Sequence, residues 1–118
     1  MLLDLTKEIQ YNVNKNDPFT INPSIINNYN DFLQENPDYN VKVVGFTDAK
    51  GQESDNYTLG QSRANEVKFQ FLASGIAASR VISLSVGESQ ASIPAIANDA
   101  ARQPDRKVQL NSQPSKIP

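Results

Sequence analysis

The chain of 118 residues contains neither cysteine nor histidine, and each absence excludes a class of chemistry. Without cysteine there is no disulfide and no thiol chemistry, although this leaves the cellular compartment open because many exported domains also lack cysteine. Without histidine, a Ser-His-Asp triad, a histidine general base and the common zinc sites are excluded.

Long apolar runs and an excess of basic residues are also absent. No run reaches the roughly 18 apolar residues that a membrane-spanning helix needs. The net charge of −2 and the pI of about 5.0 argue against a nucleic-acid-binding protein. The start, Met1–Asp4, has neither a basic nor a long apolar segment and is not predicted to be a signal peptide. The length predicts one domain, and we expect any exporting or anchoring segment to lie outside this sequence.

The N-terminal half predicts two strands and one helix. Residues 3–13 alternate imperfectly between apolar and polar and predict a strand. Asn22-Pro23 is typical of a helix start, and Asn36-Pro37 is typical of a helix end. Residues 41–46 are the clearest strand, since they are apolar except for Lys42. This composition predicts a central strand that is covered on both faces.

The C-terminal half predicts a long helix and two more strands. The helix starts at Asp55 or Asn56, runs to about Ser74 and stops at Gly75. Its small and apolar side chains recur on one face, which we expect to be buried; they are Gly60, Ala64, Val67 and Phe71. Residues 80–86 predict a strand whose inward side chains are Ile82, Leu84 and Val86.

The last third is predicted from weaker patterns. Residues 91–102 are rich in alanine and favour a short helix, and residues 106–110 predict the final strand, with Val108 and Leu110 on the same face as Arg106. We expect residues 1–112 to form the domain and residues 113–118 to be a polar, disordered tail. The order β-α-β-α-β-(α)-β predicts an α+β fold with helices on one side of a mixed sheet.

One motif runs from the central strand into the second helix: Gly45-Phe46-Thr47-Asp48-Ala49-Lys50-Gly51, then Asn56-Tyr57-Thr58-Leu59-Gly60-Gln61-Ser62-Arg63-Ala64. This pattern, GxTDxxG followed by NxxLxxxRA, resembles the signature of OmpA-like peptidoglycan-binding domains. The resemblance extends from about Leu5 to about Leu110 and includes a closing basic pair, Arg106-Lys107. It implies a two-layer sandwich with helices on a mixed four-stranded sheet of order 1-4-2-3.

The resemblance also implies a function. Domains of this family are not enzymes and need no cofactor. They bind the meso-diaminopimelate of peptidoglycan stem peptides and anchor the outer membrane, or a membrane protein, to the cell wall. The expected location is thus the periplasm of a Gram-negative bacterium, in association with the outer membrane. The expected partner is peptidoglycan, with no nucleic acid.

The diaminopimelate side chain ends in an ammonium and a carboxylate on one carbon, so its site needs an anion and a cation close together. Asp48 and Arg63 supply these charges, and arginine suits a carboxylate because its planar fork donates two parallel hydrogen bonds. The N-terminus of the second helix adds a favourable dipole for an anion. The residues that the resemblance assigns to the ligand are Asp48, Arg63, Asn56, Thr47, Arg106, Asn12 and Leu59. Thr47 is expected to support the site, and we expect Asp48 and Arg63 at its rim.

Three positions depart from the family pattern. Phe46 stands where the family often has histidine, and Gly60 stands where serine is frequent. Asn12 stands where some members carry a carboxylate, and a neutral amide forfeits the charge assistance to the ligand ammonium.

The same residues are also compatible with structural roles and with other functions. Asp48 is also compatible with a turn cap, Arg63 with a structural ion pair, and Asn56 with a helix cap. Asp48, Glu53 and Asp55 suggest a cation site, but their spacing fits no EF-hand loop. The functional alternatives are a protein-interaction module that has kept the fold and lost wall binding, and an enzyme that acts on the wall.

Overall fold

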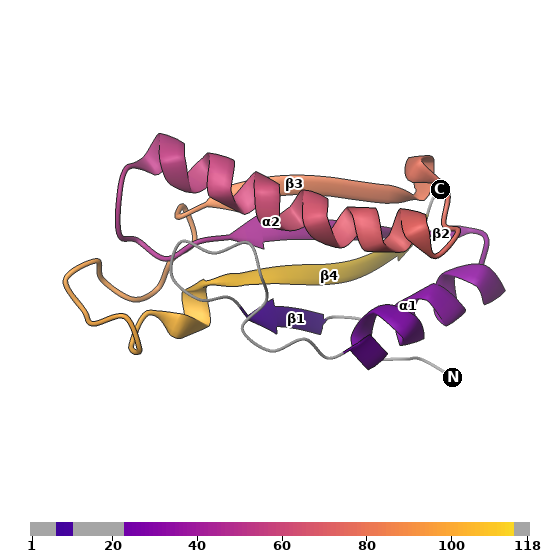
Figure 1. Cartoon of the computed structure of the whole chain (residues 1–118), viewed down its shortest axis with the longest axis horizontal. Coiled ribbons are helices and arrows are strands. Elements are labelled where there is room, and N and C mark those ends of the chain that lie inside the picture. Colours follow the sequence, from indigo (N-terminus) through magenta and orange to yellow (C-terminus); the bar gives the residue numbers. More distant parts are fainter. Residues whose placement is uncertain (1–6, 11–22, 115–118) are drawn as a thin grey trace.

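The computed structural model describes residues 7–10 and 23–114, and it shows an α+β fold built on one mixed sheet (Figure 1). The strands are β1 (Lys7–Gln10), β2 (Tyr39–Phe46), β3 (Val81–Gly87) and β4 (Lys107–Pro114), in the order β1-β4-β2-β3. β2 runs parallel to β3 and antiparallel to β4, which is antiparallel to β1. This order agrees with the one that the resemblance implied.

Helix α1 (Pro23–Glu35) begins at the predicted proline and contributes three buried side chains to the core, those of Ile26, Tyr29 and Leu33. Tyr29 packs edge-on against Phe71, with ring centroids 6.1 Å apart, and its hydroxyl donates to the Leu110 carbonyl at 3.1 Å. Leu33 is fully buried one turn further on. α1 therefore belongs to the same apolar core as the second helix and the sheet.

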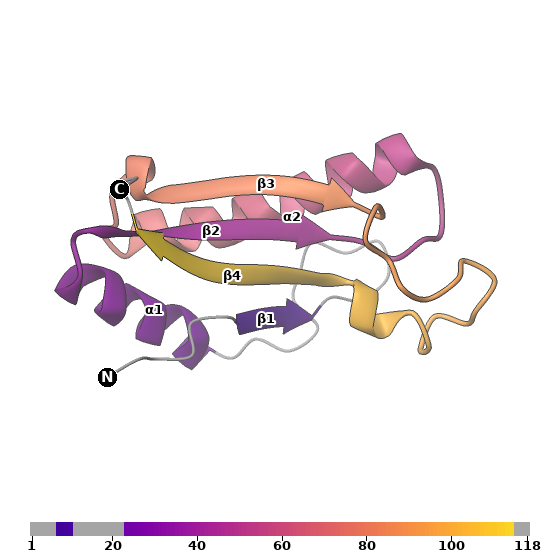
Figure 2. The same cartoon turned by 180° about the vertical axis from the view of Figure 1, so that it is seen from behind.

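Helix α2 (Glu53–Ala73) lies over β2 and β3 on one face of the sheet (Figures 1 and 2). The predicted inward face is confirmed, because Gly60, Ala64, Val67 and Phe71 are all buried. The helix begins slightly earlier than predicted, with Gln52 as the N-cap residue. Its end is as predicted, since Gly75 has φ 97° and so adopts the left-handed conformation that terminates helices.

The backbones of α2 and the sheet touch where two glycines meet. A Cβ atom added to Gly45 on β2 would lie 1.8 Å from the carbonyl oxygen of Gly60 on α2. A Cβ atom added to Gly60 would in turn lie 2.3 Å from Ser85 Oγ on β3. These two positions therefore require glycine, and they seat the first half of α2 directly on the ends of β2 and β3.

The prediction for the facing of β3 was wrong. Ser83 and Ser85 face α2, and Ser83 Oγ donates to Asn65 Oδ1 at 2.9 Å, whereas Ile82 on the opposite face is 38% exposed. Leu84 and Val86 alternate with the serines and so share the outer face with Ile82. The physical reason is the close approach of α2 at Gly60, which leaves room only for a small side chain at Ser85.

β2 is central, as predicted, but within the described residues helices cover only one of its faces (Figure 2). Val41 and Val43 belong to the core beneath the helices. Val44 and Phe46, on the opposite face, are buried without a helix over them, and the Lys107 ammonium lies 5.0 Å from the centre of the Phe46 ring. The side chain of Lys107 on the neighbouring strand thus gives Phe46 part of its cover on this face.

The short helix expected at residues 91–102 is not an α-helix. This segment consists of turns, followed by the 3-10 helix η2 (Gln103–Asp105); another 3-10 helix, η1 (Ala78–Arg80), precedes β3. The buried Asp105 carboxylate accepts hydrogen bonds from the backbone N–H groups of Ser92 and Ile93, at 3.1 and 2.9 Å. These hydrogen bonds hold the segment in a loop against η2, which helical periodicity does not foresee.

The ends of the domain also differ from expectation. β4 continues through residues 113 and 114, which were assigned to the tail, because Gln113 and Pro114 pair with Asn40 and Tyr39 of β2. β1 falls inside the strand predicted for residues 3–13, the remainder of which lies outside the described residues. Neither α1 nor α2 is long and apolar enough to cross a membrane.

Candidate ligand-binding site

The residues predicted to bind a ligand gather at one end of the sheet, on the left of Figure 1. The end of β2, the loop at residues 47–52, the first turns of α2 and the residue before β4 meet there. Together they line a cavity of about 10 Å³, which is room for about one water molecule. Its lining residues are Thr47, Asp48, Asn56, Leu59, Arg63 and Arg106. Asn12 lies outside the described residues, so its placement stays a prediction.

The Asp48 carboxylate is the anionic centre of this cavity and is 6% exposed. Its Oδ1 accepts a hydrogen bond from the backbone N–H of Lys50 at 3.0 Å, and its Oδ2 accepts one from Arg106 Nη1 at 2.9 Å. Asp48 thus caps a turn, as one of the alternatives held, and it also forms a buried ion pair with Arg106. The ion pair considered as an alternative from the sequence was between Asp48 and Arg63, whereas the structure pairs Asp48 with Arg106.

Arg63 enters the cavity from α2 and is fully buried. Its Nη1 donates to the Phe46 carbonyl at 3.1 Å, at the last residue of β2. We expected Asp48 and Arg63 at an exposed rim, and this expectation was wrong, because both side chains lie inside the protein surface. Both charged groups therefore contribute to the fold as well as to the site.

Asn56 connects three segments around the cavity and is not the helix cap. Its Nδ2 lies within hydrogen-bond distance of the carbonyl oxygens of Asp48 and Lys50, at 3.3 and 3.0 Å, and of Glu88 Oε1, at 2.9 Å. Asn56 therefore ties the 47–52 loop to α2 and to the turn after β3.

Thr47 is buried in the wall of the cavity. Its hydroxyl donates to the Asp48 carbonyl at 3.1 Å, and its backbone N–H donates to the Gly87 carbonyl at 2.9 Å. The N-terminus of α2 offers less to an anion than predicted, because Glu53 and Asp55 in its first turn already complement the helix dipole.

Two arginines before β4 complete the charge cluster, and sequence reasoning missed one of them. Arg102 is 1% exposed, and its Nε lies 3.9 Å from Asp48 Oδ2. Its guanidinium also donates to Asp99, which lowers the pKa of that carboxyl. A signal was present in the charged residues of the segment 102–106, which directly precedes the last strand, but the alanine-rich composition of residues 91–102 had placed Arg102 at the end of a predicted helix.

The remaining predicted chemistry can be placed against this geometry. In the part of the chain that the structure describes, no group of three or more Asp, Glu, His or Cys side chains is arranged to hold a metal ion. Asp48, Glu53 and Asp55 therefore do not form the cation site that their sequence positions suggested.

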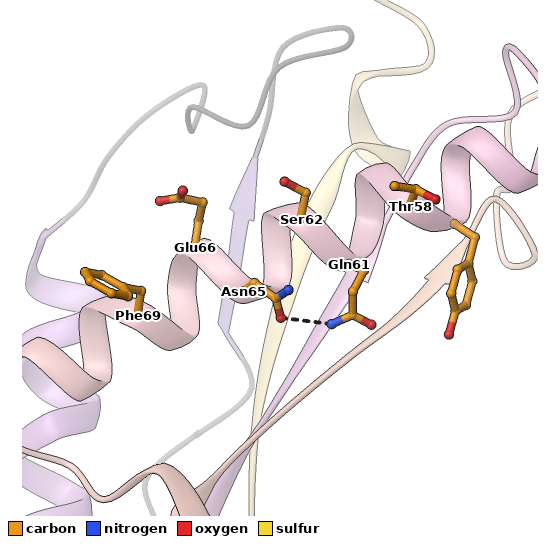
Figure 3. A pocket seen from close by; sticks show the side chains of 7 residues that line it. Thr58, Gln61, Ser62, Asn65, Glu66 and Phe69 are labelled. Atoms are coloured by element: carbon orange, nitrogen blue, oxygen red, sulfur yellow. Dashed lines mark hydrogen bonds between the residues drawn. The ribbon is translucent and has the colours of Figure 1, made fainter.

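A larger hollow of about 510 Å³ lies on the outer side of α2 (Figure 3). Figure 3 shows side chains standing on one exposed helix face, with Gln61 donating to Asn65 at 3.0 Å. Of its lining residues only Glu66 is charged, so no opposite charges converge there; the lining residues are Tyr57, Thr58, Gln61, Ser62, Asn65, Glu66 and Phe69. The smaller cavity around Asp48 thus has the more specific chemistry.

Comparison with known proteins connects this fold and site to a family. The OmpA family matches residues 14–109. Outer membrane porin F of Pseudomonas fluorescens is 36% identical to this chain over 86 residues. The aligned residues make up 73% of this chain and 26% of that protein. Over 62 residues the chain is 39% identical to the peptidoglycan-associated lipoprotein of Pasteurella multocida, covering 52% of this chain and 41% of that protein. The chain thus spans about a quarter and about two fifths of the length of these two relatives.

Solved structures show the same fold at low sequence identity. The peptidoglycan-associated lipoprotein from Burkholderia pseudomallei superposes with a TM-score of 0.80 at 20% identity, covering 90% of this chain and 89% of that one. The periplasmic domain of Helicobacter pylori MotB gives a TM-score of 0.67 at 16% identity, covering 98% and 80%.

The fold and the family match together define the class of this protein as a non-enzymatic binding domain of the cell envelope. The chain belongs to the OmpA family, whose domains usually bind peptidoglycan.

Proposed function

We propose that this domain binds peptidoglycan non-covalently through the meso-diaminopimelate of its stem peptides. The observation that supports this most strongly is the convergence of Asp48, Arg63 and Arg106 on one small buried cavity. A carboxylate and guanidinium groups held this close suit a ligand that carries both an ammonium and a carboxylate.

Each charged group has a role in this proposal. Asp48 accepts the ligand ammonium, while Arg63 donates to the ligand carboxylate, because a guanidinium pairs with a carboxylate through two parallel hydrogen bonds. Asn56 and Thr47 hold the 47–52 loop, and with it the Asp48 backbone, in place. Leu59 supplies the apolar wall of the cavity. Asn12 would accept a further hydrogen bond from the ammonium.

The test compares two stem tetrapeptides that differ in their third residue, diaminopimelate or lysine. Both present a side-chain amine, but only the diaminopimelate peptide has a second carboxylate on the carbon that bears this amine. Free lysine is unsuitable, since its own α-carbon carries both charges. Leaving a buried guanidinium without its anion costs about 1–3 kcal/mol or more, so we expect discrimination of about tenfold to a few hundredfold. Equal affinities in calorimetry would contradict the proposal.

We further propose that the domain acts in the periplasm and tethers the outer membrane, or a membrane protein, to the wall. The family match and the relation to an outer membrane porin and a peptidoglycan-associated lipoprotein support this location. Sedimentation with purified sacculi separates this role from a protein-interaction module that has lost wall binding. A domain that stays in the supernatant while folded would favour the second function.

A further inference from the structure

Asp48, the proposed partner of the ligand ammonium, is already paired inside the protein. Its Oδ2 accepts from Arg106 Nη1 at 2.9 Å and its Oδ1 accepts from the Lys50 backbone at 3.0 Å, so both oxygens are engaged. The Asp48 and Arg106 residues are 6% and 4% exposed. A ligand ammonium that approaches Asp48 must therefore compete with the guanidinium of Arg106.

The size of the cavity points to the same competition. A volume of about 10 Å³ holds about one water molecule and is far too small for an amino-acid centre. One lining side chain has to move, and Arg106 is suited to do so because its guanidinium ends a long flexible chain. Asp48 and Asn56, by contrast, are short and are tied to the backbone of the 47–52 loop.

Moving Arg106 has a cost that depends on the ligand. A buried guanidinium that loses its anion is strongly unfavourable unless another anion replaces it. A ligand with only an ammonium satisfies Asp48 and offers Arg106 nothing to replace the pair with Asp48. A ligand with an ammonium and a carboxylate on one carbon satisfies both partners of the broken pair.

We propose that Arg106 determines specificity through an exchange of ion-pair partners. The Asp48–Arg106 pair opens, the ligand ammonium takes the place of Arg106 at Asp48, and Arg106 turns to the ligand carboxylate beside Arg63. This inference rests on the proposed function and extends it: the closed pair makes the domain require both charges together.

Arg102 is placed to assist the exchange. Its Nε is buried without a hydrogen-bond partner and faces the same Asp48 oxygen from 3.9 Å. When Arg106 leaves, Asp48 therefore keeps a cationic neighbour that has an unused donor. The carboxylate remains compensated while its partners change.

The experiment measures both stem tetrapeptides by calorimetry on the whole domain and on Arg106→Gln. With the competing guanidinium removed, the site is available in every molecule, so affinity for the lysine peptide should rise about threefold or more. Affinity for the diaminopimelate peptide should fall or stay level, since its carboxylate loses one donor. The control is Lys107→Gln, which removes the same charge one position away, where the ammonium lies over the Phe46 ring. It should leave both affinities unchanged.

Three results separate this inference from the proposed function. In the first, the affinity of Arg106→Gln for the lysine peptide falls by the same factor as its affinity for the diaminopimelate peptide. That result would overturn the exchange of ion-pair partners and leave the proposed function standing. A wild-type domain that binds neither peptide would overturn both. If Arg106→Gln is less heat-stable than the wild type, Arg106→Lys is the deciding variant. A single ammonium cannot contact both Asp48 and Gln103, as the Arg106 guanidinium does at 2.9 and 2.8 Å. The preference for the diaminopimelate peptide over the lysine peptide should therefore shrink in this variant. Unchanged selectivity in that variant would overturn the exchange.

Discussion

At the scale of single residues, the site is built from charges that are also part of the protein interior. Asp48, Arg63 and Arg106 are each at most 6% exposed, although charged side chains are rarely buried unless they are paired. We therefore expect their removal to lower stability as well as the proposed binding. An alanine at position 63 would leave a cavity and an unused Phe46 carbonyl, so near-isosteric changes are the better probes of this site.

Replacing Asp48 with asparagine keeps the shape of the side chain and removes its charge. We expect stem-peptide affinity to fall by about tenfold or more, because a neutral amide pairs weakly with an ammonium. The free energy of unfolding should fall by about 1–3 kcal/mol, since the buried Arg106 loses its ion pair with Asp48. Calorimetry and urea denaturation measure the two effects. Asp31→Asn, on an exposed position of α1, should change neither; an unaltered affinity in Asp48→Asn would remove Asp48 from the site.

At the scale of elements, prediction from sequence succeeded where side-chain size and spacing decide the structure. The four inward residues of α2 follow from helical periodicity, and the stop at Gly75 follows from its freedom to adopt positive φ. The facing of β3 did not follow, because alternation identifies two faces without saying which is inside. Only the contact of α2 with Gly45 shows why the serines lie inward.

Two phenylalanines on α2 test the orientation of this helix. Phe71 is fully buried and Phe69 is 69% exposed, although they are two positions apart. Phe71→Ala should lower the free energy of unfolding by about 3–5 kcal/mol through lost burial and a new cavity. Phe69→Ala, a surface change, should stay within about 0.5 kcal/mol. Similar losses in urea denaturation would show that α2 packs through another face.

The contact between Gly45 and Gly60 makes a separate prediction. Gly45→Ala should destabilise the domain by about 1–3 kcal/mol or more, because the added methyl group meets helix backbone that cannot rotate away. It should also weaken stem-peptide binding, since α2 carries Asn56 and Arg63 into the cavity.

Gly75→Ala is the matched control for this change. It strains a backbone with φ 97° but meets no atom within 4 Å, so it should cost about 1 kcal/mol and leave binding unaltered. Thermal melts and calorimetry on the two variants compare crowding with strain. If Gly45→Ala and Gly75→Ala change stem-peptide affinity equally, the packing of α2 on Gly45 does not position the site.

At the scale of the whole molecule, the family pattern predicted which distant segments meet. Local sequence patterns did not predict the hydrogen bonds that stabilise the loop before β4. The order of the sheet and the convergence of Asp48, Asn56 and Arg63 agree with the resemblance. The alanine-rich composition of residues 91–102 favours a helix, whereas hydrogen bonds to the side chain of Asp105, which lies 12 or more residues from its partners, hold this segment as a loop. Such tertiary hydrogen bonds leave no periodic trace in a sequence.

Asp105→Asn tests whether this loop positions the arginines of the site. An amide oxygen accepts more weakly than a carboxylate, so the N–H groups of Ser92 and Ile93 should exchange hydrogen faster. Core amides such as that of Val43 should keep their protection, because the helices and the sheet remain packed. Stem-peptide affinity should fall as Arg102 and Arg106 lose their support. If the amides of Ser92 and Ile93 exchange hydrogen faster and stem-peptide affinity is unchanged, the loop does not position the arginines of the site.

The antiparallel course of β4 has a mechanical consequence. β4 starts beside the cavity and ends at Pro114, opposite Tyr39 at the far end of β2, and it is flanked by β1 and β2. A load applied at that far end, against a ligand gripped in the cavity, acts along the strand. The hydrogen bonds between β4 and its two neighbouring strands run across the strands. They are therefore loaded together in shear and do not break one after another. The domain should therefore resist tension along this axis better than tension that peels β4 away from its neighbours.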